Sequence, residues 1–233
     1  MQKLASAVDV AQVAALVGDP TRALMLHALM DGRALPAGEL AWFGRVSPQT
    51  ASEHLNRLAD GGLLAVHRQG RHRYYRLAGP LVGQVLEGLM TLAAVQAPPR
   101  GGRRTRVDEA LQNARTCYDH LAGRLGVALA DSLAAHGHVE LSAEAGAVTP
   151  EGLRFLAALG VELPQEGTGL RFCRPCLDWT ERRLHLGGLL GRGLAARCFE
   201  LGWLERVKDS RAVSVTAAGA AGLERHFGIV LPA

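Results

Sequence analysis

The sequence lacks any run of eighteen consecutive apolar residues, which is the length that a membrane-spanning helix needs. Its first residues, MQKL, also lack the basic stretch and apolar core of a secretory signal. We therefore expect a soluble, cytoplasmic protein. With 233 residues, of which 48% are hydrophobic, the chain has enough apolar side chains for packed cores. The net charge is only +4, so the position of the charges matters more than their sum.

Cysteine is absent from the first half of the chain. All four cysteines lie in the second half, at Cys117, Cys173, Cys176 and Cys198. In a reducing cytosol this usage favours free thiols or metal ligands over a structural disulfide framework.

A segment rich in proline, glycine and arginine, PPRGGRR at residues 98–104, divides the chain. The prolines end the preceding helix, and the arginines keep the segment solvated. We predict an N-terminal domain over residues 1–96, a linker over 97–107 and a C-terminal domain over 108–233. The linker is either a flexible basic spacer or an arm that touches phosphate.

Hydrophobic periodicity in the first domain predicts helices followed by one β-hairpin. We expect helices over residues 10–17, 20–31, 36–43, 48–60 and 81–95, and strands over 64–66 and 74–77. The second helix should bury Leu24, Leu26 and Leu29, and the fourth should bury Ala51, Leu55 and Leu58. The apolar stripe of the last helix suits an antiparallel dimer seam, although core packing explains it nearly as well. The expected class is mainly α with small β-hairpin wings.

Two features of this domain indicate DNA binding. Short helices joined at residues 44–46 form the angled pair that lets one helix enter a major groove. Polar side chains near the start of the second of these helices can reach base edges and phosphates. The hairpin at residues 67–76 holds four arginines and no acid. Unscreened cations on a protruding tip suit contact with phosphate or the minor groove.

Four motifs in this region resemble the ArsR family of repressors: LVGDPTR at residues 16–22, VSPQTASEHL at 46–55, LADGGLL at 58–64 and GRHRYY at 70–75. The resemblance covers roughly residues 8–95. It implies a homodimer, joined through the helix at 81–95, on double-stranded DNA with an inverted-repeat operator that an effector releases. The expected DNA contacts are Ser47, Gln49, Thr50, Ser52, His54, Arg57, Arg68, Arg71 and Arg73.

The sequence departs from the metal-sensing members of that family. Their cysteines precede the recognition helix, where this chain has ELAWF at residues 39–43, and their other ligands lie on the last helix, where this chain has only Glu87. Neither place can assemble the three or four ligands of a soft metal. The effector should therefore be sensed in the C-terminal domain.

The C-terminal domain contains a weak internal repeat. VTPEG at residues 148–152 and VTAAG at 215–219 each open a helix, and each follows an apolar helix, a glycine, a short strand and a turn. We predict an α+β domain with winged-helix-like units, to which independent use of common turns is the alternative.

The cysteines of this domain suggest a soft-metal site. On a helix, Cys117 and His120 would share a face. Cys173 and Cys176 have the C-x-x-C spacing of a chelate, and adding Cys117 with either His120 or Cys198 would complete a tetrahedral set. Alternatively the cysteines are small buried apolar groups, or thiols that sense oxidants. A disulfide-oxidoreductase role is disfavoured because no βαβ setting is visible.

A small organic effector is a further alternative, with an anion clamped by Arg182 and Arg183 and stacked on Trp179. The candidate effector-sensing residues are Cys117, Asp119, His120, Cys173, Cys176, Asp178, Trp179, Arg182, Arg183 and His185.

The leading interpretation is a non-enzymatic repressor that an effector, a thiol modification or a soft metal releases from its operator. The alternatives are a regulator that responds to a small organic ligand, or a tandem winged-helix module for protein contact with weak DNA binding.

Overall fold

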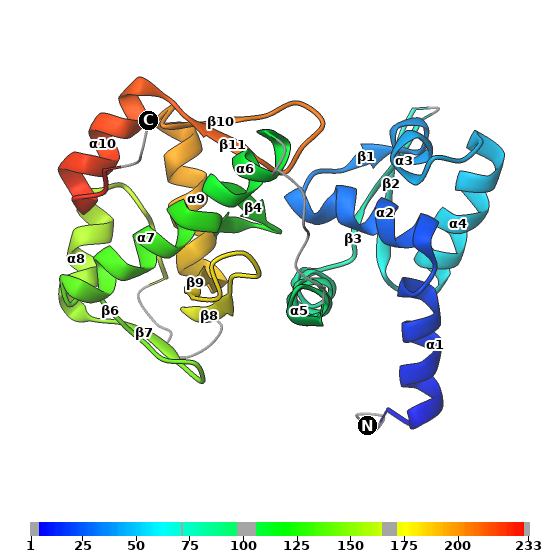
Figure 1. The fold of residues 1–233 in the computed structure, drawn as a ribbon, viewed down its shortest axis with the longest axis horizontal. Coiled ribbons are helices and arrows are strands. Elements are labelled where there is room, and N and C mark those ends of the chain that lie inside the picture. Colours follow the sequence, from blue (N-terminus) through cyan, green and yellow to red (C-terminus); the bar gives the residue numbers. More distant parts are fainter. Residues whose placement is uncertain (1–4, 71, 97–105, 165–171, 231–233) are drawn as a thin grey trace. The chain divides into compact units, whose positions relative to one another are not determined.

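The structure is a computed structural model that describes residues 5–70, 72–96, 106–164 and 172–230 (Figure 1). The chain divides into two compact units, Met1–Leu86 and Glu87–Ala233. The division falls inside helix α5 (Pro80–Gln96). Most of the predicted linker, residues 97–105, lies outside the described residues. Within the part of the chain that the structure describes, no helix is long and apolar enough to cross a membrane.

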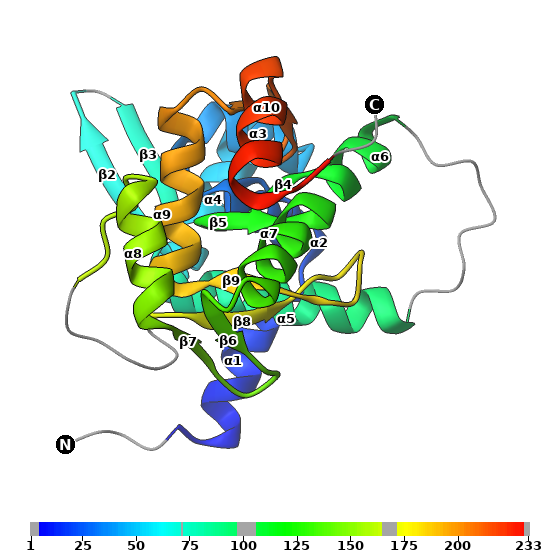
Figure 2. The same ribbon diagram turned by 90° about the vertical axis from the view of Figure 1, so that its left-hand side faces the viewer.

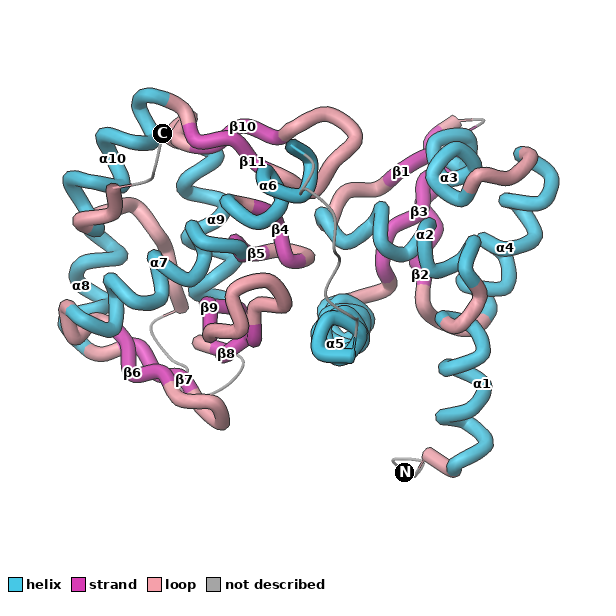
Figure 3. Tube along the Cα trace, viewed as in Figure 1, coloured by secondary structure: helices cyan, strands magenta, loops and turns pink. Residues whose placement is uncertain are grey.

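The first unit is a group of helices against a small antiparallel sheet of strand order β1-β3-β2. Its elements are α1 (Ala7–Val17), α2 (Pro20–Ala28) with a 3₁₀ turn (Leu29–Asp31), β1 (Leu35–Pro36), α3 (Ala37–Gly44), α4 (Pro48–Asp60), β2 (Leu64–Gln69), β3 (His72–Leu77) and the start of α5. Figure 3 distinguishes the helices (cyan) from the strands (magenta). The predicted helices and hairpin are confirmed. Strand β1 was not predicted, because two residues are too few to show an alternating pattern.

Capping side chains start helices α2 and α4. Asp19 accepts a hydrogen bond from the backbone N–H of Arg22 at the start of α2, and Ser47 accepts one from Thr50 at the start of α4. A proline follows each cap, at the position where it is tolerated. The start of α4 is therefore set by local sequence.

The interior faces of these helices agree with the prediction at α4 and differ at α2. Ala51, Leu55 and Leu58 are fully buried, as expected. Leu24, which was expected inside, is 43% exposed. Leu26 and Leu29 are fully buried as expected, together with Met25, and a turn of about 100° per residue leaves Leu24 on the outer side of α2.

The second unit has a helical majority with several short hairpins, which agrees with the predicted α+β class. Its elements after α5 are α6 (Arg106–Asn113), β4 (Arg115–Cys117), β5 (His120–Ala122), α7 (Gly123–Ala135), β6 (Val139–Leu141), β7 (Gly146–Val148), α8 (Pro150–Ala158), β8 (Arg174–Leu177), β9 (Leu184–Gly187), α9 (Gly188–Glu200), β10 (Leu204–Arg206), β11 (Val213–Val215) and α10 (Ala217–Phe227). Each hairpin is a separate two-stranded antiparallel sheet.

The order hairpin, helix, hairpin, helix occurs twice in the second unit, from β4 to α8 and from β8 to α10. Local contacts repeat with it. The Thr149 hydroxyl caps α8 and donates to the carbonyl of Gly137, while the Thr216 hydroxyl caps α10 and donates to that of Gly202. The weak internal repeat of the sequence is therefore a structural repeat. Its likeness to winged helices stays a prediction.

The two repeats interlock, since α7 packs against β9 and α9 packs against β5 (Figure 2). Each helix thus covers the hairpin of the other repeat. Glycines permit this close approach. A Cβ atom on Gly191 would lie 3.0 Å from Cβ of His120 in the other repeat, and one on Gly126 would lie 3.6 Å from Cβ of His185. Gly191 therefore serves the packing of α9 against the hairpins.

Candidate nucleic-acid interface and candidate metal centre

The start of α4 presents most of the predicted groove residues. Helix α3 ends at Gly44, and the left-handed backbone of the next residue, Arg45 (φ 56°), turns the chain toward α4. Ser47, Gln49 and Ser52 are exposed at the start of α4, and Thr50 is half-buried. The helix therefore holds short polar groups on its outer side, where they are free to meet a DNA groove.

His54 is positioned differently from the other predicted groove residues. It is half-buried, its Nδ1 lies 3.4 Å from Nη1 of Arg22, and the same atom lies 3.7 Å from Oδ1 of Asp19. These contacts join α4 to the start of α2. His54 therefore helps to hold α4 against the start of α2, and it also lies beside the exposed face of α4.

The β2–β3 hairpin places cations beside α4. Arg68 and Arg73 are exposed and face each other across the two strands. Arg73 donates a hydrogen bond to Oδ1 of Asn56 on α4 (3.4 Å), and Arg57 of the same helix is exposed. Arg71 lies outside the described residues. The described cations of the wing thus adjoin the recognition helix, as contact with phosphates on both sides of a groove requires.

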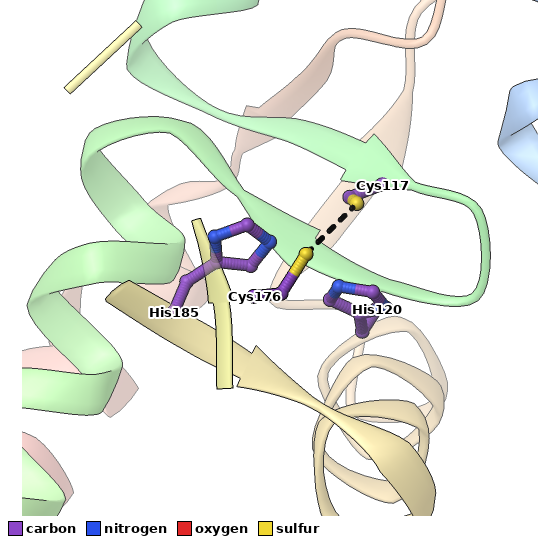
Figure 4. Close-up of side chains that lie close together, drawn as sticks. All are labelled: Cys117, His120, Cys176 and His185. Carbon is purple, nitrogen blue, oxygen red and sulfur yellow. Dashed lines mark hydrogen bonds between the residues drawn. The ribbon is translucent and has the colours of Figure 1, made fainter. Parts of the chain in front are cut away.

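Four buried side chains of the second unit converge on one point (Figure 4). Their ligand atoms all lie within 4.8 Å of one another. We call this cluster the Cys–His centre; it consists of Cys117, His120, Cys176 and His185. The sulfur of Cys176 lies between the two imidazoles, with Cys117 across from it (Figure 4).

Each repeat contributes one cysteine and one histidine through the register of a hairpin. Cys117 of β4 is directly opposite His120 of β5, and Cys176 of β8 is directly opposite His185 of β9. Opposite residues of an antiparallel pair project from the same face of the sheet. Each hairpin is therefore half of the centre, and the interlocking of the repeats brings the halves together.

The predicted helical face for Cys117 and His120 is wrong, although the two residues do meet. They lie in a hairpin whose turn is formed by Tyr118, with a left-handed backbone (φ 58°), and Asp119. A two-residue turn sets residues i and i+3 opposite each other, so the spacing fits a hairpin as well as a helix.

The C-x-x-C chelate is not formed. Cys173 precedes β8 and packs against Gly146, in the large apolar core that also holds Cys198. Side chains alternate along extended backbone, so positions i and i+3 face opposite ways. Burial raises the pKa of Cys173 to about 11 and that of Cys198 to about 12. Both are buried thiols. His185 takes the place that the sequence interpretation gave to Cys173.

Electrostatics favour a thiolate at Cys176. The pKa of Cys176 is held well below its usual range by the Cys117 thiol, whose sulfur lies 3.9 Å away, and by the two nearby imidazoles. Burial acts in the opposite direction. Burial, Cys176 and Glu87 raise the pKa of Cys117 well above its usual value. Burial alone would lower the pKa of His120, but Asp119 and Cys176 raise it to about 9. The centre thus holds one sulfur ready to bind a cation.

The histidines have unmet hydrogen-bonding capacity. His120 is 1% exposed and His185 is fully buried. Nε2 of His120 and both ring nitrogens of His185 have no hydrogen-bond partner among the residues that the structure describes. Buried polar atoms are nearly always satisfied. Two sulfur and two nitrogen donors form the tetrahedral set that zinc and similar soft or borderline ions take. The residues fit such an ion.

The predicted anion clamp is not supported by the contacts of its members. Nη2 of Arg183 lies 2.7 Å from the Asp131 carboxylate, and Arg182 is exposed in a turn with a left-handed backbone (φ 54°). The Trp179 ring stacks on the guanidinium of buried Arg115, whose carbon lies 4.5 Å from the ring centre. The Trp179 ring therefore stacks on a cation of the protein itself, in the way that the prediction assigned to a bound ligand.

Two buried ion pairs surround the Cys–His centre. Nη2 of Arg115 donates to Oδ2 of Asp178 (2.8 Å), and both side chains are completely buried. Glu87, the one candidate ligand on the predicted last helix, accepts a hydrogen bond from Nη1 of Arg211 (3.2 Å). The Arg115 charge holds the pKa of Asp178 well below its usual range, although burial opposes it.

Known proteins match both units. The helix-turn-helix domain family matches residues 17–67. The "Uncharacterized HTH-type transcriptional regulator YdfF" of Bacillus subtilis (strain 168) is 42% identical over 225 residues, which are 95% of this chain and 98% of the relative. This chain belongs to the ArsR family of HTH-type transcriptional regulators. It binds DNA through its winged helix-turn-helix, and its chain extends well beyond that domain.

Two further known proteins match shorter parts of this regulator. The "Transcriptional repressor SdpR" of Bacillus subtilis (strain 168) is 36% identical over 61 residues, which are 26% of this chain and 67% of the relative. The crystal structure of NolR from Sinorhizobium fredii is 26% identical, covers 40% of this chain and 96% of its own, and has a TM-score of 0.35. YdfF is named as a transcriptional regulator and SdpR as a transcriptional repressor, in agreement with the expected non-enzymatic role.

Proposed function

We propose that this regulator is a homodimeric repressor whose affinity for its operator changes when a soft metal ion binds the Cys–His centre. The main support is the convergence of four buried side chains whose ligand atoms lie within 4.8 Å of one another. Both histidines also have ring nitrogens without a hydrogen-bond partner among the described residues. The name of the relative SdpR supports a repressing role.

The DNA contacts proposed are those of the exposed start of α4 and of the wing. Gln49 and Ser52 face outward to reach base edges, while Arg57, Arg68 and Arg73 are placed to meet phosphates. For Arg71 the proposal rests on the sequence motif alone. Ser47, Thr50 and His54 shape the helix start through their capping and packing contacts.

The proposed dimer forms along α5. Leu81, Val85, Leu89 and Leu92 are exposed. They recur at helical spacing along one side of that helix, as the dimer interpretation of the sequence requires. A second copy of the chain would cover this apolar stripe, whereas packing within one chain leaves it in water.

Linkage sets the energy that the metal must supply. To change operator affinity by about 10- to 100-fold, the ion must bind one form of the protein more tightly than the other by the same factor, about 1.4–2.7 kcal/mol. A closed site of four protein ligands has ample binding energy for such a difference.

The test is operator binding by the full chain with and without metal. The protein is stripped with a chelator, and its affinity for its own upstream DNA is measured before and after addition of Zn²⁺, Cd²⁺ or Cu(I). We expect a change of about tenfold or more with at least one ion. The change should be absent in Cys176→Ser and present in Cys198→Ser, the matched buried cysteine outside the centre.

Elemental analysis of the same samples completes the test. Unchanged operator affinity with every ion, in a protein that binds none of them, contradicts the metal proposal. Circular dichroism of each variant shows whether a lost response comes from lost folding.

The short distance between Cys117 and Cys176 supports a second candidate, an oxidation switch. Their sulfurs lie 3.9 Å apart in the same unit. In this reaction the two thiols lose two protons and two electrons to a peroxide, which is reduced to water or an alcohol, and an S–S bond forms. Thiol counts before and after peroxide, with operator binding measured in parallel, separate this candidate from metal binding. Release by peroxide that persists in Cys117→Ser contradicts it.

A further inference from the structure

Each half of the Cys–His centre contains an aspartate two residues after its cysteine. The sequence C-x-D occurs at residues 117–119 and again at 176–178. Each histidine likewise begins the sequence H-L-x-G-x-L-G, at 120–126 and at 185–191. The two repeats therefore share their ligands and also the acid that accompanies them.

Both aspartates face the same ring atom of the histidine in their own repeat. Nδ1 of His120 lies 3.1 Å from Oδ1 of Asp119, and Nδ1 of His185 lies 3.9 Å from Oδ2 of Asp178. Nε2 of each ring is buried and has no hydrogen-bond partner among the described residues, and Nδ1 of His185, at 3.9 Å from its carboxylate, is likewise not hydrogen-bonded to them. Each ring thus turns one nitrogen to a carboxylate and the other toward the shared centre.

We infer that Asp119 and Asp178 are positioning residues of the metal centre, each holding the histidine of its own repeat so that Nε2 faces a tetrahedral d¹⁰ ion such as Zn²⁺. The inference rests on the metal binding proposed above. A carboxylate on the far nitrogen of a histidine ligand fixes the tautomer and the ring orientation, and makes the imidazole a stronger donor.

The two carboxylates differ in their other contacts. Asp178 is completely buried, and its Oδ2 also accepts hydrogen bonds from Arg115 (2.8 Å) and from the backbone N–H of Gly123 (2.6 Å). Asp119 lies in the hairpin turn, with its side chain 26% exposed. Removal of Asp178 would disturb the fold and the histidine together. Asp119 is therefore the residue that isolates the effect on the histidine.

The experiment compares wild type with Asp119→Ala, Asp119→Asn and Asp131→Ala in the full chain. Zn²⁺ affinity is measured by competition with a chromophoric chelator, and Co²⁺ absorption reports the coordination geometry. We expect about 10- to 100-fold weaker Zn²⁺ binding in Asp119→Ala, together with an altered Co²⁺ spectrum. Asp119→Asn keeps an oxygen that accepts from Nδ1 but loses the charge, so its affinity should be intermediate.

Asp131→Ala removes another exposed carboxylate of the same unit, one that pairs with Arg183, and should leave Zn²⁺ affinity unchanged. If wild type binds Zn²⁺ and Asp119→Ala binds it equally well, the positioning role is overturned while the metal centre stands. If wild type binds neither Zn²⁺ nor Co²⁺, the proposed metal function fails and this inference fails with it. The positioning role is also overturned if the free energy of Zn²⁺ binding lost in Asp119→Ala equals the free energy of unfolding lost by the same variant without metal.

Discussion

The two units of this regulator place their functional residues in opposite ways. In the first, the candidate DNA contacts lie on the surface, close together in the sequence, on one helix and one hairpin. In the second, the candidate ligands are buried, and Cys117 and Cys176 lie 59 residues apart. A surface that reads DNA has to be exposed and preformed. A chelate is best enclosed, because water and wrong partners are then excluded. The comparison shows why one site is visible in a sequence and the other is hidden.

The largest effect should come from breaking the buried ion pair of the second unit. Arg115→Ala leaves the Asp178 carboxylate buried without its cation, and should lower the free energy of unfolding of this unit by about 3–5 kcal/mol. Arg183→Ala removes an exposed pair with Asp131 and should cost at most about 1 kcal/mol. Urea unfolding followed by hydrogen exchange measures each unit separately. Equal effects of the two substitutions would show that the Arg115 pair is not buried as described.

Substitution of a glycine at the crossing of the repeats should have the next largest effect. A Cβ atom at position 191 would lie 3.0 Å from Cβ of His120 in addition to its clash with the Leu186 carbonyl. Gly191→Ala should therefore destabilise the second unit by about 1–3 kcal/mol and weaken metal binding. Gly38→Ala is the control in the first unit, because its added methyl group would have no atom of the described residues within 4 Å, apart from its chain neighbours and its own helix backbone. Thermal unfolding with metal titration tests both variants, and an unaffected Gly191→Ala would contradict the close packing.

Loss of Gln49 should affect the first unit in a different way, through sequence preference. Gln49→Ala should reduce discrimination between the operator and a mutated site by about 1–3 kcal/mol, while folding is retained. Arg73→Ala should instead weaken binding to both sequences and lower the salt slope of binding by about 1. Affinities measured over a salt series distinguish the two variants. A Gln49→Ala variant with wild-type discrimination would remove Gln49 from the set of base contacts.

The smallest predicted effects concern matched helix caps in the two units. Ser47→Ala and Thr216→Ala each remove a side chain that accepts from a helix N-terminus, and each should cost about 1 kcal/mol of stability. Only Ser47→Ala should also weaken operator binding, because its helix is the one proposed to enter the groove. Denaturant unfolding and operator affinity are measured together. An equal loss of operator affinity in both variants would contradict the separation of roles between the units.

The sequence allowed a close prediction of the first unit because its signals are local. Asp19 and Ser47 mark helix starts, each followed by a proline, and the spacing of Ala51, Leu55 and Leu58 identifies an inward face. The errors there are small and have a clear cause. Leu24 was placed inside on hydrophobicity, although its angular position on α2 puts it outside. Strand β1 is too short to produce a pattern.

In the second unit the sequence indicated the right residues and the wrong arrangement. All four members of the Cys–His centre were among the candidates, but spacing alone favoured Cys173 over His185. The distinction depends on whether residues 173–176 are extended or helical, and on which strand lies opposite. A better signal was present, because H-L-x-G-x-L-G follows both His120 and His185. That repetition relates the two histidines and sets Cys173 and Cys198 apart from them.

By itself, the sequence determined the winged helix-turn-helix, its caps and the basic hairpin, since these depend on residues a few positions apart. It also determined that the second unit repeats a pattern of hairpins and helices. Only the tertiary structure decided that Cys117, His120, Cys176 and His185 form one centre. Their meeting depends on two hairpin registers and on the crossing of α7 and α9 over the opposite hairpins, and such long-range packing is not encoded in any single stretch of the chain.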